Sequence, residues 1–358
     1  MRLDDVARHR LHNQHIQRPT FDDPAKVVRW FGAVQAQEFF DALWAVGLRT
    51  RGALKGTIER AIAERTIVRT WPMRGTLHFV APDDAHWMLK LLTPRVIAAS
   101  ASRHRQLELD LAVFRRAEKV LISSLRGGKA LTRPAIYEKL NAAGIRTHDS
   151  RGLHILGYLA QRGVICFGAR DGKQATFVLL DEWVPNARAL DRHDALVELA
   201  RRYITSHGPA TVHDFAWWAG LTVADAREGL EGASLRVEQI EGRSYWLASV
   251  PRIHGPKSSR AYLLPVYDEY TVAYRDRSAV LDPKLAKHVN AGGGVLRPIV
   301  VIDGRVMGTW KRSIEKGAAI VTITSFTRLP KYRREAIEDA AARYARFLGT
   351  VTRVQHSH

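Results

Sequence analysis

One order of elements recurs along this chain: three helical stretches followed by two strands. Residues 112–182 show apolar residues at helical spacing, Thr132 as a helix N-cap, and strands on either side of a turn at residues 170–172. Residues 190–250 repeat this order, and residues 1–95 follow it more loosely. The order is that of a winged helix, so the sequence predicts three such units in tandem.

The last part of the chain has a different periodicity. Residues 261–274, 296–312 and 318–326 indicate strands, Asp303-Gly304 is a two-residue turn signal, and residues 331–348 indicate a basic amphipathic helix. These strands could close as a small barrel or form an open sheet. The predicted fold class is α+β, in four segments: winged helix 1 (1–95), a linker helix with winged helix 2 (96–182), winged helix 3 (183–250), and a strand-rich, barrel-like domain with a C-terminal helix (251–358).

The net charge indicates a polyanionic partner. The chain has 55 Lys and Arg against 36 Asp and Glu, a formal charge of +19. Residues 1–150 and 251–358 each contribute +10 and residues 151–250 contribute −1, so the basic residues belong to folded segments rather than to a tail. Nucleic acid is the partner this favours, and a generally basic, solvated surface is the alternative.

Several chemistries lack the residues they need. Cys166 is the only cysteine, which excludes an intramolecular disulfide and a thiolate metal site and fits a reducing compartment. His12 and His15 have no further ligands nearby, and no GxxxxGK[ST], GxGxxG, HExxH or GxSxG motif occurs. No 18-residue apolar run occurs either. We therefore expect a cytoplasmic protein without a metal, a cofactor or a membrane span.

Two glutamines stand inside an otherwise apolar stretch. Gln35 and Gln37 would point about 200° apart on an unbroken helix, so they converge on one reactant only if the helix breaks there. A catalytic amide pair and a buried pair that caps backbone groups are equally compatible with this spacing.

The glutamine pair also belongs to a wider pattern. Together with the segments at residues 71–79, 264–270, 275–278 and 303–312, it resembles the bacterial AlkZ/YcaQ winged-helix DNA glycosylases. The resemblance implies three tandem winged helices on a C-terminal β-barrel, in a C-shaped molecule around duplex DNA. It also implies excision of alkylated purines and the unhooking of interstrand crosslinks.

The resemblance further implies a catalytic role for Gln35 and Gln37. Gln37 places the chain in the Gln-x-Gln branch, which includes enzymes that protect producers of azinomycin-type alkylators, although Ala36 is smaller than the aliphatic residue typical of the motif. An N3- or N7-alkylated purine is already cationic and leaves as a neutral base without being protonated. Two amide oxygens that orient a water would then suffice.

Other residues are candidates for supporting roles. Glu38 and Asp268 are the nearest alternatives for a catalytic carboxylate, with a solvated helix residue and a turn hydrogen bond as their structural interpretations. The stretch at residues 290–297 could be a hairpin tip against a DNA groove or a surface loop. The candidate DNA contacts are Arg69, Arg74, Arg151, Lys311 and Arg312.

These observations predict a monofunctional alkylpurine DNA glycosylase, a hydrolase that acts as a monomer on double-stranded DNA. No lysine stands in a setting typical of a nucleophile, so the expected product is an abasic site. The alternative is a winged-helix transcriptional regulator without catalysis, which would dimerise on a palindromic operator.

Overall fold

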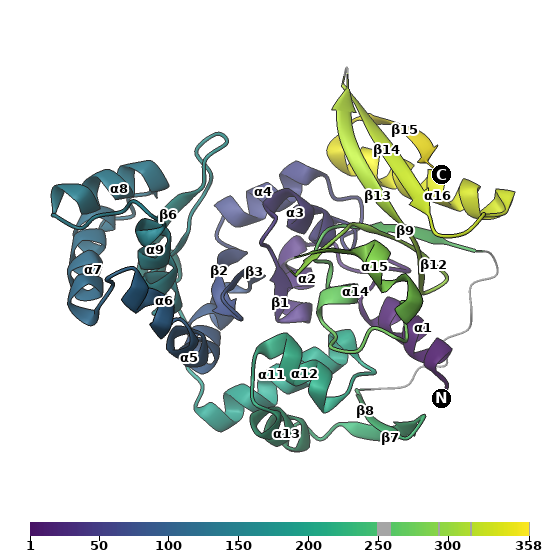
Figure 1. The fold of residues 1–358 in the computed structure, drawn as a ribbon, viewed down its shortest axis with the longest axis horizontal. Helices are drawn as coiled ribbons and strands as arrows, with labels where there is room; N and C mark the ends of the chain where they lie inside the picture. Colours follow the sequence, from purple (N-terminus) through teal and green to yellow (C-terminus); the bar gives the residue numbers. More distant parts are fainter. Residues whose placement is uncertain (249–258, 293, 316, 358) are drawn as a thin grey trace. The chain divides into compact units, whose positions relative to one another are not determined.

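The computed structural model describes residues 1–248, 259–292, 294–315 and 317–357. The chain forms two compact units, one built from Met1–Glu59 and Leu196–His358 and the other from Arg60–Ala195 (Figure 1). The chain passes between them within α4 (Lys55–Ala63) and α11 (Arg192–His207). The predicted segment 1–95 therefore contains residues of both units.

The unit at residues 60–195 is a set of helices around strands that pair in the order β3-β2-β5-β6-β4. α7 buries Phe114, Ala117, Leu121 and Leu125, a helical spacing of three and four residues that turns one face to the core. The order of three helices and a hairpin predicted here is present as α7, α8, α9, β5 and β6. Its elements are β2 (Val68–Met73), β3 (Thr76–Val80), α5 (Pro82–Ala99), α6 (Ala101–Gln106), α7 (Leu111–Leu125), β4 (Leu131–Thr132), α8 (Arg133–Ala142), α9 (Arg151–Gln161), β5 (Ile165–Phe167), β6 (Thr176–Leu179) and α10 (Leu180–Trp183).

The other unit begins with α1 (Leu3–Asn13), α2 (Pro24–Phe31), β1 (Ala33–Gln35) and α3 (Phe39–Gly47). Its second part repeats the predicted order of helices and hairpin, because α11 is followed by α12 (Val212–Ala219), α13 (Val223–Gly232), β7 (Arg236–Ile240) and β8 (Arg243–Leu247). The side chains of Thr211 and Thr222 accept hydrogen bonds at the N-termini of α12 and α13.

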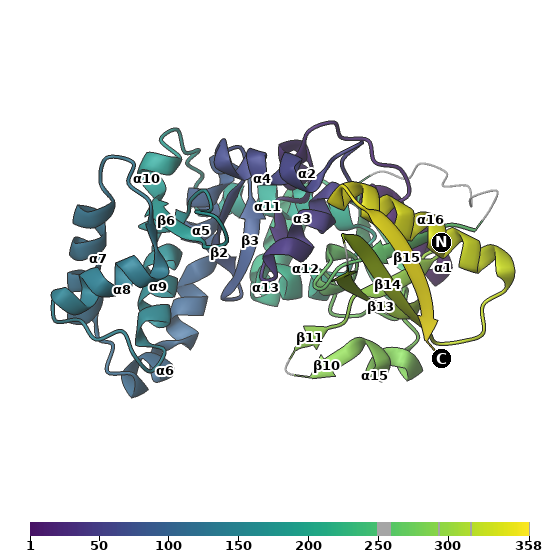
Figure 2. The same ribbon diagram turned by 90° about the horizontal axis from the view of Figure 1, so that it is seen from above.

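A five-stranded sheet completes this unit, with α16 packed against β9 and β15 (Figure 1). β14 and β15 pair in parallel and the other neighbours are antiparallel. Among the described residues the strand order is β15-β14-β13-β12-β9, an open sheet and not a closed barrel. The short β10–β11 hairpin lies beside α15 (Figure 2). The remaining elements are β9 (Ala261–Leu264), α14 (Glu269–Val272), η1 (Pro283–Leu285), α15 (Ala286–Val289), β10 (Asn290–Gly292), β11 (Val295–Leu296), β12 (Ile299–Ile302), β13 (Arg305–Glu315), β14 (Ala318–Ser325), α16 (Lys331–Leu348) and β15 (Val351–Ser357).

One element differs from its prediction. Residues 261–274 do not form a single strand, because β9 ends at Leu264 and α14 begins at Glu269. Asp268 starts this helical turn by accepting a hydrogen bond from the backbone N–H of Tyr270 at 2.9 Å. A short apolar run does not distinguish a buried strand from a buried helix, which is why the sequence pattern misled. The predicted turn at Asp303-Gly304 and the helix at residues 331–348 are confirmed.

Candidate active site

The segment that contains Gln35 and Gln37 leaves the helical conformation, as convergence of the two glutamines requires. α2 ends before Gly32, whose φ of +78° is a left-handed conformation that glycine adopts without strain. β1 follows and ends at Gln35, and α3 begins after Glu38. The break in the helix is thus confirmed.

The two glutamines differ in their exposure. The side chain of Gln35 is buried, at 8% exposed, whereas Gln37 is exposed to solvent. A buried pair that only caps backbone groups does not fit an exposed Gln37. The side chain of Gln35 therefore lies inside the protein, and that of Gln37 lies at the surface.

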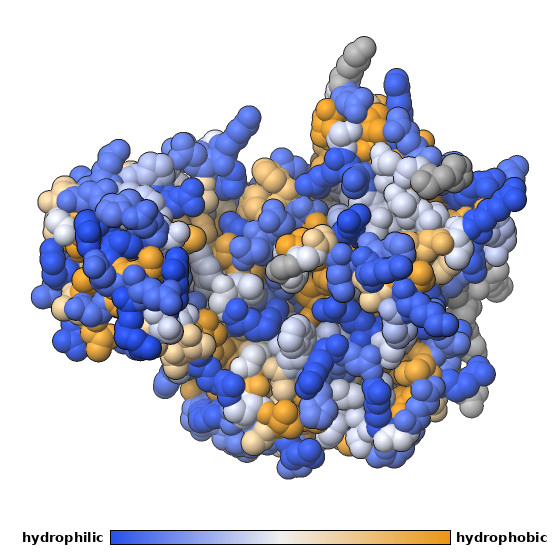
Figure 3. Space-filling view, in the orientation of Figure 1, coloured by the Kyte–Doolittle hydropathy of each residue, from blue (hydrophilic) through white to orange (hydrophobic). Residues whose placement is uncertain are grey.

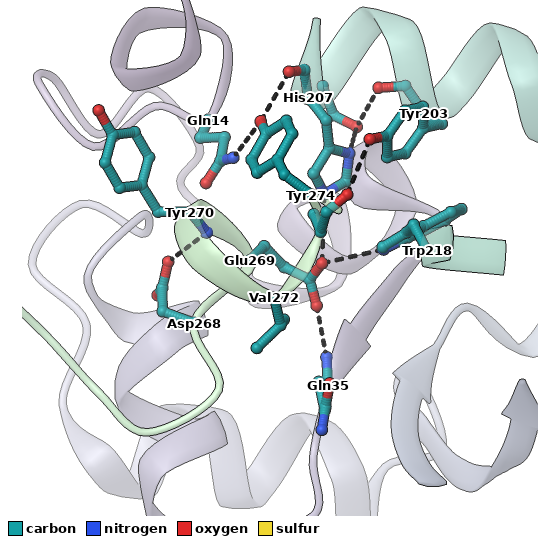
Figure 4. Close-up of polar contacts among 12 residues, drawn as sticks. Gln14, Gln35, Tyr203, His207, Trp218, Asp268, Glu269, Tyr270, Val272 and Tyr274 are labelled. Carbon is teal, nitrogen blue, oxygen red and sulfur yellow. Dashed lines mark hydrogen bonds and ion pairs between the residues drawn. The ribbon is translucent and has the colours of Figure 1, made fainter. Parts of the chain in front are cut away.

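A buried carboxylate holds the main chain at Gln35. Oε1 of Glu269 accepts the backbone N–H of Gln35 at 2.8 Å, and Oε2 accepts the indole N–H of Trp218 at 3.0 Å (Figure 4). Nε2 of His207 lies 3.3 Å from the same Oε2. Glu269 is 1% exposed, so these hydrogen bonds form away from water, where they are strong.

His207 completes this cluster as a neutral ring. Burial lowers its pKa, against the opposing effect of the hydrogen bond to Glu269. A neutral imidazole that donates from Nε2 accepts at Nδ1, and the hydroxyl of Ser206 lies 2.8 Å from that nitrogen. Tyr274 donates its hydroxyl hydrogen to the carbonyl oxygen of His207 at 2.7 Å and accepts from Gln14 at 3.0 Å. The cluster thus joins α11, α12 and α14 to Gln14, the C-cap residue of α1.

Asp268 has a structural role. Its two carboxylate oxygens each lie 2.8 Å from a guanidinium nitrogen of Arg49, and the two residues are 0% and 2% exposed. Arg49 also donates to the carbonyl oxygen of Ala45 and to both oxygens of Gln14. The turn hydrogen bond was the structural interpretation of Asp268, and the ion pair adds to it. This carboxylate does not face solvent and is not a catalytic candidate.

Glu38 stays on the surface next to Gln37. Burial raises the pKa of the Tyr267 phenol, and the charge of Glu38 adds to this shift. Burial is also the main reason that the pKa of Asp41 is raised, with Glu38 adding to it and Arg312 opposing it. Tyr267 has a φ of +58°, a strained conformation for an aromatic residue, in the turn just before Asp268. Glu38 thus lies close enough to Tyr267 and Asp41 to affect the pKa of each.

The predicted DNA contacts are not equally accessible. Arg69 is 8% exposed, and its guanidinium lies 4.6 Å from the centre of the Phe167 ring. Arg74 is half-buried in the turn between β2 and β3. Lys311 is exposed on β13, whereas Arg312 donates to the Tyr344 hydroxyl and lies 3.6 Å from a carboxylate oxygen of Asp41. The face drawn in Figure 3 is largely hydrophilic.

Arg151 was predicted as a DNA contact, and its position contradicts that role. It is 7% exposed, and its guanidinium donates to the backbone carbonyls of Leu107, Glu108 and Arg146. A residue in the first turn of α9 was expected to face solvent, but the side chain folds back onto the loop before α7. Arg151 therefore stabilises that loop.

The residues considered for metal or thiol chemistry are now placed. Within the described ranges, no three His, Cys, Asp or Glu side chains are arranged to bind a metal ion. Burial raises the pKa of the Cys166 thiol, which keeps it protonated. None of the helices in the described ranges has the length and hydropathy needed to cross a bilayer.

Comparison with known proteins identifies the family. The family model for AlkZ-like DNA glycosylases matches residues 28–347. The chain belongs to the AlkZ-like DNA glycosylase family. A relative named interstrand DNA cross-link repair glycosylase, from Streptomyces sahachiroi, is 27% identical over an alignment of 371 positions that includes 95% of this chain and 95% of the relative. The solved structure of the Streptomyces sahachiroi DNA glycosylase AlkZ matches with a TM-score of 0.83 at 26% identity and covers 100% of both chains. The α+β fold is that of an AlkZ-like glycosylase.

Sequence reasoning missed part of this AlkZ-like site. Glu269, His207 and Trp218 were not candidates, although Glu269 lies in one of the segments that indicated the family. Two adjacent acids, Asp268 and Glu269, lie inside the predicted strand at residues 261–274, and the sequence did not show which of them would reach Gln35. The one available signal was that both acids lie inside an apolar stretch, where an ionised group needs specific partners.

Proposed function

We propose that this protein is a monofunctional DNA glycosylase that hydrolyses the N-glycosidic bond of cationic N7- or N3-alkylated purines. Gln35 and Gln37 are its catalytic residues. The observation that most supports this function is the break between α2 and α3, which takes both glutamines off the helix and leaves Gln37 accessible while Glu269 holds Gln35. Membership of the AlkZ-like family supports the same reaction class.

The chemistry fits neutral amides. The transition state of N-glycosidic cleavage has oxocarbenium character, and enzymes often provide a carboxylate that stabilises the positive charge and activates water. A cationic alkylpurine departs with the bonding electron pair and becomes neutral, so it needs no proton from the enzyme. The amide oxygens of Gln35 and Gln37 orient the water that attacks the anomeric carbon, and the water's proton passes to solvent. Positioning and dipoles supply the catalysis.

We further propose that interstrand crosslinks made through N7 of guanine are substrates. Unhooking such a crosslink requires the same bond cleavage at one of the two cationic purines. The Streptomyces sahachiroi relative is named for crosslink repair and aligns over 95% of this chain.

The two repeats of helices and hairpin, α7 to β6 and α11 to β8, support winged-helix units, with the looser repeat at residues 1–95 as a third. The open sheet of β9 and β12 to β15 is the scaffold in this proposal. The protein binds duplex DNA as a monomer in this proposal. Lys311 and Arg312 are the exposed candidates for phosphate contacts, Arg74 is half-buried, and Arg69 is the least accessible of the four.

The test uses a duplex with one N7-methylguanine. Purified protein is incubated with this duplex, and strand scission after alkali treatment is compared with the uncatalysed background. Wild type should produce abasic sites, and the Gln35→Ala/Gln37→Ala variant should not. A duplex with an N7–N7 crosslink is tested in parallel, and unhooking appears as single-stranded product on a denaturing gel.

Two further outcomes would contradict the proposal. A covalent complex trapped by borohydride would show a lysine nucleophile and therefore a bifunctional enzyme. A tight, unique operator bound by a dimer, without base release from either duplex, would show a transcriptional regulator instead.

A further inference from the structure

We infer that Glu269 is a positioning residue for the glycosylase reaction. Its carboxylate fixes the main chain at Gln35 from inside the protein and thereby sets the direction of the catalytic amides. The inference rests on the proposed function and adds to it a residue that does not contact the substrate.

The anchor acts at the point where the chain changes course. β1 ends at Gln35, and only residues 36–38 separate it from the start of α3. The hydrogen bond from the Gln35 N–H to Oε1 of Glu269, at 2.8 Å, joins this point to α14, a segment 234 residues further along the chain. A displaced peptide at Gln35 would move the amides of both Gln35 and Gln37, because so few residues connect them.

The anchor requires a carboxylate. The two oxygens of Glu269 face three N–H groups, from Gln35, Trp218 and neutral His207. A carboxylate only accepts hydrogen bonds, whereas an amide of the same size has one accepting oxygen and one donating NH₂. In a Glu269→Gln variant, the introduced NH₂ must face the Gln35 N–H or the Trp218 N–H, and one donor loses its acceptor.

The reaction rate depends more strongly on the position of the catalytic groups when these groups are neutral amides than when they are charged. Neutral amides act by orienting water, and a misplacement of about 1 Å is enough to reduce an enzymatic rate by about 100-fold. Tyr274 provides a matched control, because it is as buried as Glu269 and hydrogen-bonds within the same cluster, to His207 and Gln14. No hydrogen bond described for its hydroxyl group reaches Gln35 directly.

The experiment measures single-turnover release of N7-methylguanine from a duplex oligonucleotide over a range of enzyme concentrations. The Glu269→Gln variant is expected to lower the maximal rate by about 10- to 100-fold and to leave the half-saturating concentration within about twofold. The Tyr274→Phe variant should lose thermal stability and keep its maximal rate within about twofold when assayed below its unfolding temperature.

A second variant tests the reason for the loss. Adding Trp218→Phe to Glu269→Gln removes the opposing N–H, so the introduced amide can turn its oxygen to Gln35 and its NH₂ to Nε2 of His207. The double variant should therefore be faster than Glu269→Gln alone. Hydrogen–deuterium exchange of the peptide that contains residues 33–38 gives a readout independent of activity, and exchange should accelerate in Glu269→Gln and slow again in the double variant.

The outcomes separate this inference from the proposed function. Absence of base release by wild type would reject the function, and the exchange rates would still report whether Glu269 holds Gln35. With an active wild type, the inference is wrong if Glu269→Gln keeps its maximal rate. It is also wrong if Tyr274→Phe loses as much rate as Glu269→Gln, or if unchanged exchange at residues 33–38 accompanies the loss.

Discussion

Replacing Asp268 with alanine should strongly destabilise the unit that contains the glutamine pair. The substitution removes both oxygens that Arg49 contacts at 2.8 Å, while the guanidinium stays at 2% exposed. It also removes the side chain that accepts the N–H of Tyr270 at the start of α14. A buried charge thus loses its counter-ion, and a helical turn loses its cap.

The size of the effect follows from these two losses. Breaking a buried ion pair by removing one partner costs about 3–5 kcal/mol. Loss of an N-cap adds about 1 kcal/mol. The contacts of Arg49 with Ala45 and Gln14 remain, so we expect a total of about 3–5 kcal/mol. At about 2–4 °C per kcal/mol for a unit of this size, the melting temperature should fall by roughly 6–20 °C.

Urea unfolding followed by tryptophan fluorescence measures this loss. The Arg49→Met/Asp268→Leu double variant is the informative control, because replacing both members of a buried pair with apolar groups is often nearly neutral. Its cost should be well below the sum of the two single substitutions. A loss of less than about 1 kcal/mol in Asp268→Ala would refute the argument, since an ion pair buried from water cannot be broken so cheaply.

Three further predictions follow from exposure and burial. Gln37→Ala should lower the base-release rate by at least about 100-fold and change the free energy of unfolding by less than about 0.5 kcal/mol, because the residue is exposed; activity and urea unfolding are measured on the same sample. Lys311→Ala should weaken DNA binding on all sequences and reduce the slope of log K against log salt by about 1. Arg151→Ala should lower the stability of the protein and leave that slope unchanged, and salt titrations of DNA binding measure both slopes. Burial lowers the pKa of His15 from 6.5 to about 4. Between these pH values the unfolded chain binds more protons than the folded chain, so stability should fall as the pH drops from 6.5 towards 4. The midpoints of urea unfolding across that range should vary less in His15→Gln.

Each of these predictions has a contradicting result. A Gln37→Ala variant that retains its rate would remove this residue from the catalytic pair. Equal salt slopes for wild type and Lys311→Ala would show that the exposed lysine contacts no phosphate. A pH dependence that is the same with and without His15 would assign it to other groups.

The local features of the site could be predicted from sequence because they depend on local rules. The need for a helix break at Gln35 and Gln37 follows from helix geometry alone, and Gly32 provides the break with its left-handed φ. The helices and hairpins of the two clearer repeats follow from apolar spacing and turn residues. The helix α16 follows from the spacing of its apolar face in the same way.

The long-range features could not be predicted. Glu269 reaches Gln35 across 234 residues of sequence, and its direction depends on where α14 begins. The burial of Arg151 could not be predicted either. Its place at the start of a helix suggested contact with solvent, but its side chain donates hydrogen bonds to carbonyls of a loop more than 40 residues earlier in the sequence. Side-chain direction inside a fold is set by tertiary contacts, which a local pattern does not contain.

For the proposed reaction, the arrangement of the site also predicts selectivity among bases. A carboxylate in contact with the substrate would help to activate water against any bound nucleotide, whereas neutral amides assist only a base that is ready to leave. Glu269, at 1% exposed, acts on the main chain of Gln35 and so provides order without supplying a base to the reaction. An undamaged purine is neutral and would leave as an anion unless it were protonated, and neither glutamine is an acid. If Gln35 and Gln37 catalyse the proposed reaction, we therefore expect the protein to bind normal DNA without releasing its bases.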